Sequence, residues 1–239
     1  MFIAEWLGDA LLAAGGGVIA LMVVFWILVV VAFIVAIVFL AKHFEKKRTE
    51  SLMPVAESLG MEFSPDEDEH LLAAMQVFKR FNLGHSRKMR NVMKAETESA
   101  KLAIFDYRYT TGHGKNQTVH KQTVFAMQTI ELKSPKFLLR PEGFLDKIGS
   151  MIGGQDIDFD SHPKFSKLFV LQGDSEEEVR RFFDAKLLEF FEQNEGLYVE
   201  AATGAIIFFR GKQRKPEEIR ELMDQGYAAY AAIAERASR

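Results

Sequence analysis

The sequence predicts an α+β fold, in which a single N-terminal transmembrane helix is followed by a cytosolic α+β domain. Residues 18–40 form an unbroken apolar run without a charged side chain. After residue 50 the spacing of apolar residues alternates between the helical period of about 3.6 and the strand period of 2. All 30 Lys and Arg residues follow residue 41, whereas only Glu5 and Asp9 of the 33 acidic residues precede it.

The apolar run is long enough to cross a bilayer. At about 1.5 Å per residue it makes a helix of roughly 34 Å, which exceeds the hydrocarbon thickness of about 30 Å. A helix also pairs its own backbone groups, as lipid requires. A cleaved signal peptide is not expected, because the segment before the run is acidic, the run is too long and no small-residue cleavage site precedes Lys42. We therefore predict a transmembrane helix at residues 18–41.

The flanks of this span set its expected orientation. Residues 1–17 predict an N-terminal interfacial segment that Gly15–Gly17 separate from the span, with one continuous helix as the alternative. Residues 42–50 form a basic juxtamembrane segment, whose cations can contact anionic headgroups. Its cations are Lys42, Lys46, Lys47 and Arg48. The positive-inside rule then places the N-terminus outside and the C-terminal domain in the cytoplasm, at a bacterial inner membrane.

Residues 51–239 are expected to form the cytosolic domain, with 51–154 and 155–239 as two candidate subdomains. Pro54 suggests that its first helix is separate from the span. The first part is expected to begin with a helix at 50–59 that ends at Gly60, an extended piece at 61–63, a helix that begins at Ser64–Glu67, and a loop or strand start at 82–90. Strands are expected next at 91–95, 101–110, 118–132 and 137–140, with a hairpin turn at 112–116. A short helix marked by Phe144, Leu145 and Ile148 follows, before Gly149, Gly153 and Gly154.

The second part reads as a β-α-β-β-α unit. Ser175 and Glu178 have capping-box spacing, and the dense phenylalanines after them indicate two helical pieces. The elements expected here are a strand at 168–171, helical pieces from 174 to 191, a hairpin of 197–200 with 205–209, and a final helix opened by Lys215–Glu218 that buries Ile219, Leu222, Met223, Tyr227, Tyr230 and Ile233.

Composition removes several classes of chemistry. The chain has no cysteine, which excludes disulfides, zinc–thiolate sites and cysteine nucleophiles. Acidic and basic residues balance after residue 41, so we expect no general attraction to nucleic acid. The Gly112–Asn116 segment lacks the first glycine and the Ser or Thr of a phosphate-binding loop, and a strand follows it. We read it as a hairpin turn and expect no cofactor.

Two sites remain as candidates. Asp156, Asp158, Asp160 and His162 could hold a divalent metal, although the alternation also fits Ile157 and Phe159 pointing inward with the carboxylates outward. The Gly and Glu that a calcium-binding EF-hand loop requires are missing. The other candidate is a partner surface on the 101–132 hairpin around Tyr107 and Tyr109. Asp106 and Arg108 share a strand face there, and His85, His113 and His120 are expected in or near solvated loops.

Several motifs resemble a known group of proteins. The segment Phe159-Asp160-Ser161-His162-Pro163-Lys164-Phe165, followed by Phe169-Val170 and Asp174, is similar to bacterial membrane-anchored proteins that carry a cytosolic α+β domain of unknown function. The FDYRYTTGHGKN hairpin and the KPEEIR helix start look like one branch of that group. The resemblance implies the fold and a membrane location. It implies no activity and no functional residue.

These observations predict a non-catalytic, membrane-anchored binding or scaffolding module. Its expected partners are the lipid bilayer and either another protein or further copies of itself. The alternative is a membrane-tethered, metal-dependent hydrolase that uses the Asp156, Asp158, Asp160 and His162 cluster. A third hypothesis is headgroup sensing by residues 42–48.

Overall fold

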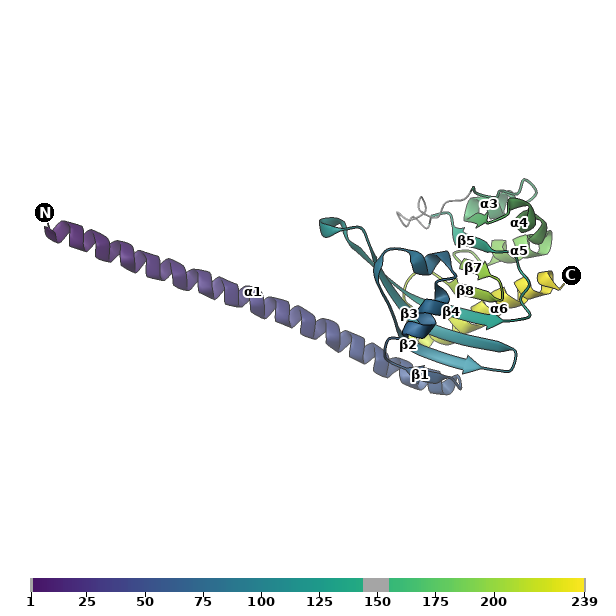
Figure 1. Cartoon of the computed structure of the whole chain (residues 1–239), viewed down its shortest axis with the longest axis horizontal. Helices are drawn as coiled ribbons and strands as arrows, with labels where there is room; N and C mark the ends of the chain where they lie inside the picture. Colours follow the sequence, from purple (N-terminus) through teal and green to yellow (C-terminus); the bar gives the residue numbers. More distant parts are fainter. Residues whose placement is uncertain (1, 144–154, 239) are drawn as a thin grey trace. The chain divides into compact units, whose positions relative to one another are not determined.

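The computed structural model describes residues 2–143 and 155–238 (Figure 1). The chain divides into two compact units, Met1–Glu50 and Ser51–Arg239. The short helix expected around Phe144, Leu145 and Ile148, and the glycines after it, lie outside the described residues.

The first unit lies within one long helix, α1 (Phe2–Ser58), which continues into the second unit. The predicted break at Gly15–Gly17 was wrong, since the helix runs through these residues; interrupting it would release backbone groups that an apolar stretch cannot pair. The predicted separation at Pro54 was also wrong. Pro54 lies in the last turns of α1, where the carbonyl that loses its N–H partner belongs to the exposed Glu50 and can be solvated.

Membrane anchoring rests on the apolar part of α1. Among the residues whose side chains are described, one helical stretch, Leu21–Ser58, is long and apolar enough to cross a membrane. Its most apolar window has a mean hydropathy of 3.4, and none of that window is buried within the protein. Large apolar side chains in this position need lipid or protein around them.

The end of α1 belongs to the folded domain. Gly60, at φ +68°, ends the helix in a Schellman motif, in which Met61 N–H donates to the Ala56 carbonyl (2.9 Å) and Gly60 N–H to the Glu57 carbonyl (3.0 Å). Leu52 and Ala56 are buried in the core beside these bonds, as the helical spacing predicts. The same turns therefore terminate the helix and fix it to the domain.

The domain is built on one eight-stranded sheet in the order β1-β2-β3-β4-β8-β7-β5-β6, with every neighbouring pair antiparallel. The strands are β1 (Glu62–Ser64), β2 (His85–Glu96), β3 (Ala100–Thr111), β4 (Thr118–Thr129), β5 (Phe137–Pro141), β6 (Phe169–Gly173), β7 (Tyr198–Ala202) and β8 (Ala205–Phe209). The helices after α1 are α2 (Glu69–Met75), η1 (Lys79–Asn82), η2 (Gly114–Asn116), α3 (Pro163–Leu168), α4 (Glu176–Phe182), α5 (Ala185–Gln193), η3 (Pro216–Glu218) and α6 (Ile219–Ala237).

The long hairpin of β3 and β4 confirms the predicted pairing, with continuous register from Ala100↔Thr129 to Thr111↔Thr118. The segment left open as a loop or strand start, residues 82–90, largely joins β2. Two register shifts in β2 coincide with Ser86 and Asn91, both at φ +52°. Such bulges let one strand absorb extra residues and still pair along its length.

The C-terminal elements follow the predicted order, but they do not form a separate β-α-β-β-α unit. β5 is inserted between β6 and β7, so one sheet joins both halves of the domain. The two helical pieces are confirmed as α4 and α5. Ser175 Oγ accepts from Glu178 N–H at the start of α4, and Asp184 Oδ1 accepts from Leu187 N–H at the start of α5.

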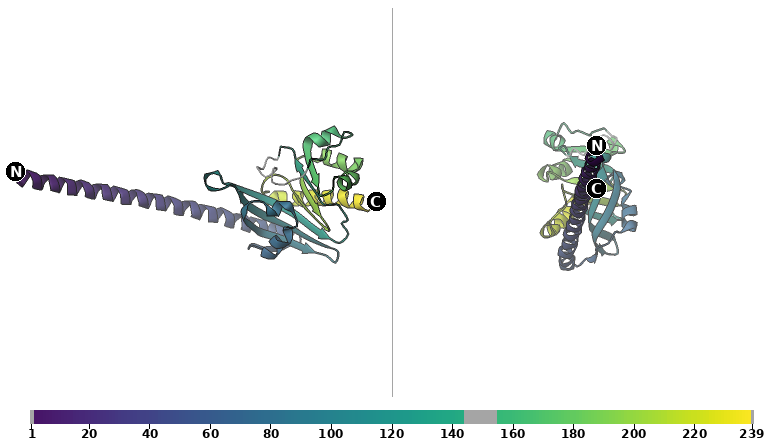
Figure 2. Two further views of the ribbon diagram at one scale, coloured as in Figure 1. Left: turned by 45° about the horizontal axis from the view of Figure 1, so that its top comes forward. Right: turned by 90° about the vertical axis from the view of Figure 1, so that its left-hand side faces the viewer.

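Helices cover both faces of the sheet, as the end-on view in Figure 2 shows. The last turns of α1 together with α3–α6 bury one face, and α2 and η1 bury part of the other. The predicted start of α2 at Ser64 was wrong: its N-cap is Asp68, which accepts from Leu71 N–H (2.8 Å) and also pairs with Lys94. These contacts hold the pKa of Asp68 below its ordinary value, with the Lys94 hydrogen bond as the largest cause.

On α6 the predicted buried side is correct for Ile219, Leu222 and Ile233 and wrong for Tyr227, which is 41% exposed. The reason is Gly226, which is buried against the Phe125 ring and brings the helix backbone close to the sheet. Tyr227 is thereby turned to the helix edge, where its ring meets Phe125 edge-on at 5.5 Å.

Candidate functional site

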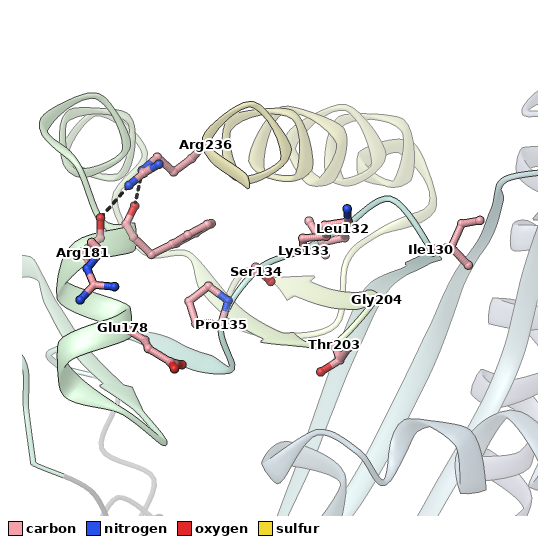
Figure 3. Close-up of a pocket in the computed structure, with 11 residues that line it drawn as sticks. Ile130, Leu132, Lys133, Ser134, Pro135, Glu178, Arg181, Thr203, Gly204 and Arg236 are labelled. Atoms are coloured by element: carbon pink, nitrogen blue, oxygen red, sulfur yellow. Dashed lines mark hydrogen bonds between the residues drawn. The ribbon is translucent and has the colours of Figure 1, made fainter. Parts of the chain in front are cut away.

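The candidate binding site is a groove of about 760 Å³ in the domain (Figure 3). Four segments distant in sequence build it: the connection after β4, α4, the β7–β8 turn and the end of α6. Its lining residues are Ile130, Leu132, Lys133, Ser134, Pro135, Glu178, Arg181, Phe182, Thr203, Gly204 and Arg236.

Close backbone packing forms the end of the groove next to the sheet. Thr129 N–H donates to the Gly204 carbonyl (2.8 Å), and Thr129 Oγ1 accepts from Glu131 N–H (3.2 Å). Gly204 has φ +69°, and a Cβ there would lie 3.2 Å from the Thr129 carbonyl oxygen. Both features favour a glycine in this turn, which fixes the connection after β4 and leaves Ile130 on the outside.

Arg236 builds the opposite wall. Its Nε donates to the Phe182 carbonyl (3.0 Å) and its Nη2 to the Arg181 carbonyl (2.7 Å), as Figure 3 shows. Nε also lies 3.4 Å from Asp184 Oδ2, and the guanidinium is 5.7 Å from the centre of the Phe182 ring. Arg236 thus donates to two carbonyls at the end of α4, of which the Phe182 carbonyl also accepts from Asp184 N–H (3.0 Å), and is a structural part of the wall.

Ile130 is the distinctive residue of the groove. It is 88% exposed, the highest value among the exposed large apolar side chains of the described residues. Leu132 and Phe182, by contrast, are buried beneath the groove. Lys133 and Glu178 are exposed at its rim. An apolar surface edged by charges is suited to bind an apolar segment of another molecule.

The groove does not assemble catalytic groups. None of its lining residues is a histidine, and Ser134 Oγ has no hydrogen-bond partner among the described residues, so no base activates it. The arrangement can bind a ligand, and nothing in it prepares a nucleophile.

A second, buried polar cluster lies on the α2 face of the sheet. The Glu200 carboxylate, on β7, accepts hydrogen bonds from Lys79 N–H, from Arg80 N–H (3.2 Å) and from Tyr198 Oη (3.1 Å). The two backbone bonds connect η1 to β7. Burial raises the pKa of Glu200, and burial followed by the nearby Glu200 charge raises that of Tyr198. Sequence reasoning missed this cluster, because Glu200 and Arg80 are separated by 120 positions.

Arg80 is 1% exposed and completes this cluster. Its guanidinium carbon lies 5.0 Å from the ring centre of Tyr109, 5.3 Å from that of Tyr198 and 5.1 Å from that of Phe209. Its Nε donates to Gln122 Oε1 (3.3 Å). Aromatic faces favour a cation at this distance, so the arginine is held in the interior as a structural element.

The predicted metal ligands do not form a recognisable metal site. Among residues 21–143 and 155–238, no group of three or more His, Asp or Glu side chains could hold a metal ion. Asp156 Oδ1 accepts from Leu171 N–H (2.9 Å), and His162 Nδ1 lies 3.0 Å from Ser161 Oγ. Burial raises the pKa of Asp156. The simpler alternation is confirmed, since Ile157 and Phe159 are buried while Asp158 and Asp160 are exposed.

The predicted partner surface at Tyr107 and Tyr109 was wrong. Both side chains are buried, at 1% and 0% exposure, because η1 covers this face of β3 with Phe81 and Arg80. Burial raises the pKa of Tyr107 to about 12. His120 stacks on Tyr109 at 4.6 Å and bonds to Thr111 Oγ1 (2.8 Å), so it is packed and not a freely solvated loop residue.

The juxtamembrane cations fall at the end of the first unit. Lys42, Lys46 and Lys47 are exposed on α1, and Lys46 Nζ lies 3.7 Å from Glu50 Oε1. Exposed pairs of this kind contribute little to stability and leave the cations able to contact an anionic surface.

Comparisons with known proteins bear on the fold alone. No family model matches the chain, and no curated protein does so. Among solved structures, the crystal structure of the mycobacterial trehalose monomycolate transport factor A, TtfA, is similar, with a TM-score of 0.54 and 14% identity. The match covers 80% of this chain and 93% of that chain. At this identity the likeness assigns no role to any residue.

Proposed function

We propose that this protein is a membrane-anchored, non-catalytic binding module whose groove takes an apolar segment of a partner protein. The observation that carries the proposal is the 88% exposure of Ile130 in a groove with a rim of charged residues. Burying an isoleucine side chain contributes about 1.5–3 kcal/mol to association. An exposed isoleucine at the edge of an open, largely apolar groove is therefore a candidate for an interface contact.

The anchor supports the location. Residues 18–40 would cross a bacterial inner membrane with the N-terminus outside and the 51–239 domain in the cytoplasm. The cations from Lys42 to Arg48 favour the cytoplasmic side, and the segment before the span carries only Glu5 and Asp9. The resemblance to uncharacterised bacterial membrane-anchored proteins is compatible with this arrangement, and so is the shared fold with a protein named as a transport factor. The metal-dependent hydrolase is not favoured, because no group of three or more potential metal ligands occurs among the residues whose side chains are described.

The prediction for Ile130 can be checked by site-specific photocrosslinking of the full chain in native membranes. A benzophenone amino acid in place of Ile130 should give a discrete protein adduct, because the groove holds a partner at this point. The same amino acid in place of Val77, which is 54% exposed on another face, is the matched control and should give none.

A groove-filling variant makes the test specific. Thr203 is exposed in the β7–β8 turn, and Thr203→Trp would occupy the groove without altering the core. We expect it to remove the adduct at Ile130. An adduct with the mass of a second copy would identify the partner as this chain itself. Equal adducts at both positions, or an Ile130 adduct that survives Thr203→Trp, would reject the groove as the binding site.

A further inference from the structure

A group of cations lies where β4 extends beyond its partner β8. The last paired residues there are Phe125 and Phe208, yet the chain after β8 stays beside β4. Gln213 N–H donates to the Lys121 carbonyl (3.1 Å), and Arg214 N–H donates to Thr123 Oγ1 (2.9 Å). The returning segment, residues 210–215, reads RGKQRK. This segment places its positively charged residues beside the part of β4 that β8 does not pair with.

Strand alternation puts three of these cations on one face, and a backbone bond places Arg214 beside them. Phe125 and Phe208 point to the face covered by α6, so Thr123, Lys121 and Arg210 point the same way. Arg108 lies opposite Lys121 on β3 and joins this face. The Arg214 backbone is bonded to Thr123 on the same face. We call Arg108, Lys121, Arg210 and Arg214 the strand-edge cluster.

The arginines of this cluster have buried donors that the protein does not use. The Nε atoms of Arg108, Arg210 and Arg214 are inaccessible to solvent, and none has a hydrogen-bond partner among the described residues. A buried N–H without an acceptor costs about 1–3 kcal/mol. Burial lowers the pKa of Arg210, and the charge of Arg214 lowers it further. The cluster thus gathers like charges and unpaired donors in one place.

The nearby carboxylates bond to other groups, and the charge of Glu221 offsets part of the repulsion at Arg210. Asp106 accepts from Asn91 Nδ2 and Thr123 Oγ1, Glu218 accepts from Lys215 N–H, and Glu221 accepts from Gln225 Nε2. No acidic residue occurs in residues 107–130 or 201–216, which supply the whole cluster. A negatively charged ligand with several oxygens could accept hydrogen bonds from the unpaired arginine donors and also offset the positive charge of the cluster.

We propose that the strand-edge cluster binds a phosphate group. Arginine guanidiniums and a lysine on one face match the oxygens of a phosphate ester. The chain favours a phospholipid headgroup as its source, because only residues 41–51 connect the apolar run to the domain core at Leu52. This short connection keeps the domain near headgroups and raises their effective concentration. The site differs from the groove at Ile130 and from the cations at residues 42–48.

The test is hydrogen–deuterium exchange on the full chain in lipid nanodiscs. The nanodiscs contain either phosphatidylcholine alone or phosphatidylcholine with about 30% phosphatidylglycerol. In a third arm, inorganic phosphate is added to the discs of phosphatidylcholine alone. We expect the backbone of residues 210–215 to exchange about tenfold more slowly with phosphatidylglycerol. Because the readout is local, contacts made by residues 42–48 do not contribute to it.

Variants complete the design. Arg210→Gln with Arg214→Gln should abolish the protection, and Lys121→Gln, an exposed change that cannot disturb the core, should weaken it. The matched control is Lys167→Gln with Arg180→Gln, which removes two exposed cations outside both the groove and the cluster and should retain full protection.

Each arm of the exchange experiment has a defined meaning. Protection by phosphatidylglycerol but not by inorganic phosphate assigns a lipid headgroup to the cluster. Protection by inorganic phosphate assigns a soluble phosphate ligand to the same residues. No protection in either arm, or protection that persists without Lys121, Arg210 and Arg214, would overturn the proposal. None of these results depends on whether the Ile130 groove binds a protein.

Discussion

Gly226→Val is expected to lower the free energy of unfolding of the domain by about 3 kcal/mol, since added atoms in a closely packed interface force the backbone apart. A Cβ at this position would lie 2.6–2.8 Å from three atoms of the Phe125 ring. Phe125 is fully buried and also packs edge-on against Phe208, with ring centres 6.5 Å apart, so it cannot move aside. Only a glycine lets α6 approach β4 so closely.

Chemical denaturation of the full chain in detergent, followed by circular dichroism, measures this effect. The matched control is Ala231→Val on the exposed side of the same helix, which should cost less than about 1 kcal/mol through helix propensity alone. Gly226→Ala should fall between the two variants, because its gain in helix propensity partly offsets the clash. Equal losses for Gly226→Val and Ala231→Val would show that α6 does not rest on Phe125.

Glu200→Leu is expected to destabilise the domain by more than about 3 kcal/mol, because it leaves buried donors without an acceptor. These donors are Lys79 N–H, Arg80 N–H and Tyr198 Oη. Glu200→Gln keeps the size but replaces one accepting oxygen with a donor, so a smaller loss of about 1–3 kcal/mol is expected. Denaturation of the three proteins side by side provides the comparison.

The free energy of unfolding is expected to depend on pH through the Glu200 carboxyl group. The folded-state pKa of Glu200 is raised above its ordinary value of 4.5, so the folded protein binds the proton more tightly than the unfolded chain. The resulting stabilisation is complete below 4.5 and is lost as the pH rises through the raised pKa. Wild type should therefore gain stability relative to Glu200→Gln on acidification from neutral pH. A difference in stability that is constant with pH would show that the buried Glu200 carboxyl group does not titrate.

Features set by local spacing could be predicted from the sequence. Gly60 ends α1, two helices follow Ser175, and Ile157 and Phe159 point inward, because each depends on residues within a few positions. The β3–β4 pairing was also accessible, since its turn and alternation lie in one continuous stretch. In each case the residues that determine the structural feature lie close to it in the sequence.

Features set by distant packing could not be predicted in this way. Alternation shows that Tyr107 and Tyr109 share a face, but only the placement of η1 shows that this face is covered. The insertion of β5 between β6 and β7 also has no local signal. The groove combines four separate segments, and Ile130 alone resembles any residue at the end of a strand. The strand predicted at 118–132 includes Ile130, whereas β4 ends at Thr129, so the prediction gave no sign that Ile130 is exposed.

Extraction of native membranes at alkaline pH tests the central claim most directly, that α1 holds the binding domain to the bilayer. The full chain is expected to stay with the membrane pellet at high pH and high salt and to be released only by detergent, since its apolar segment is solvated by lipid. Recovery of the chain in the alkaline supernatant would contradict membrane anchoring, and the proposed function with it.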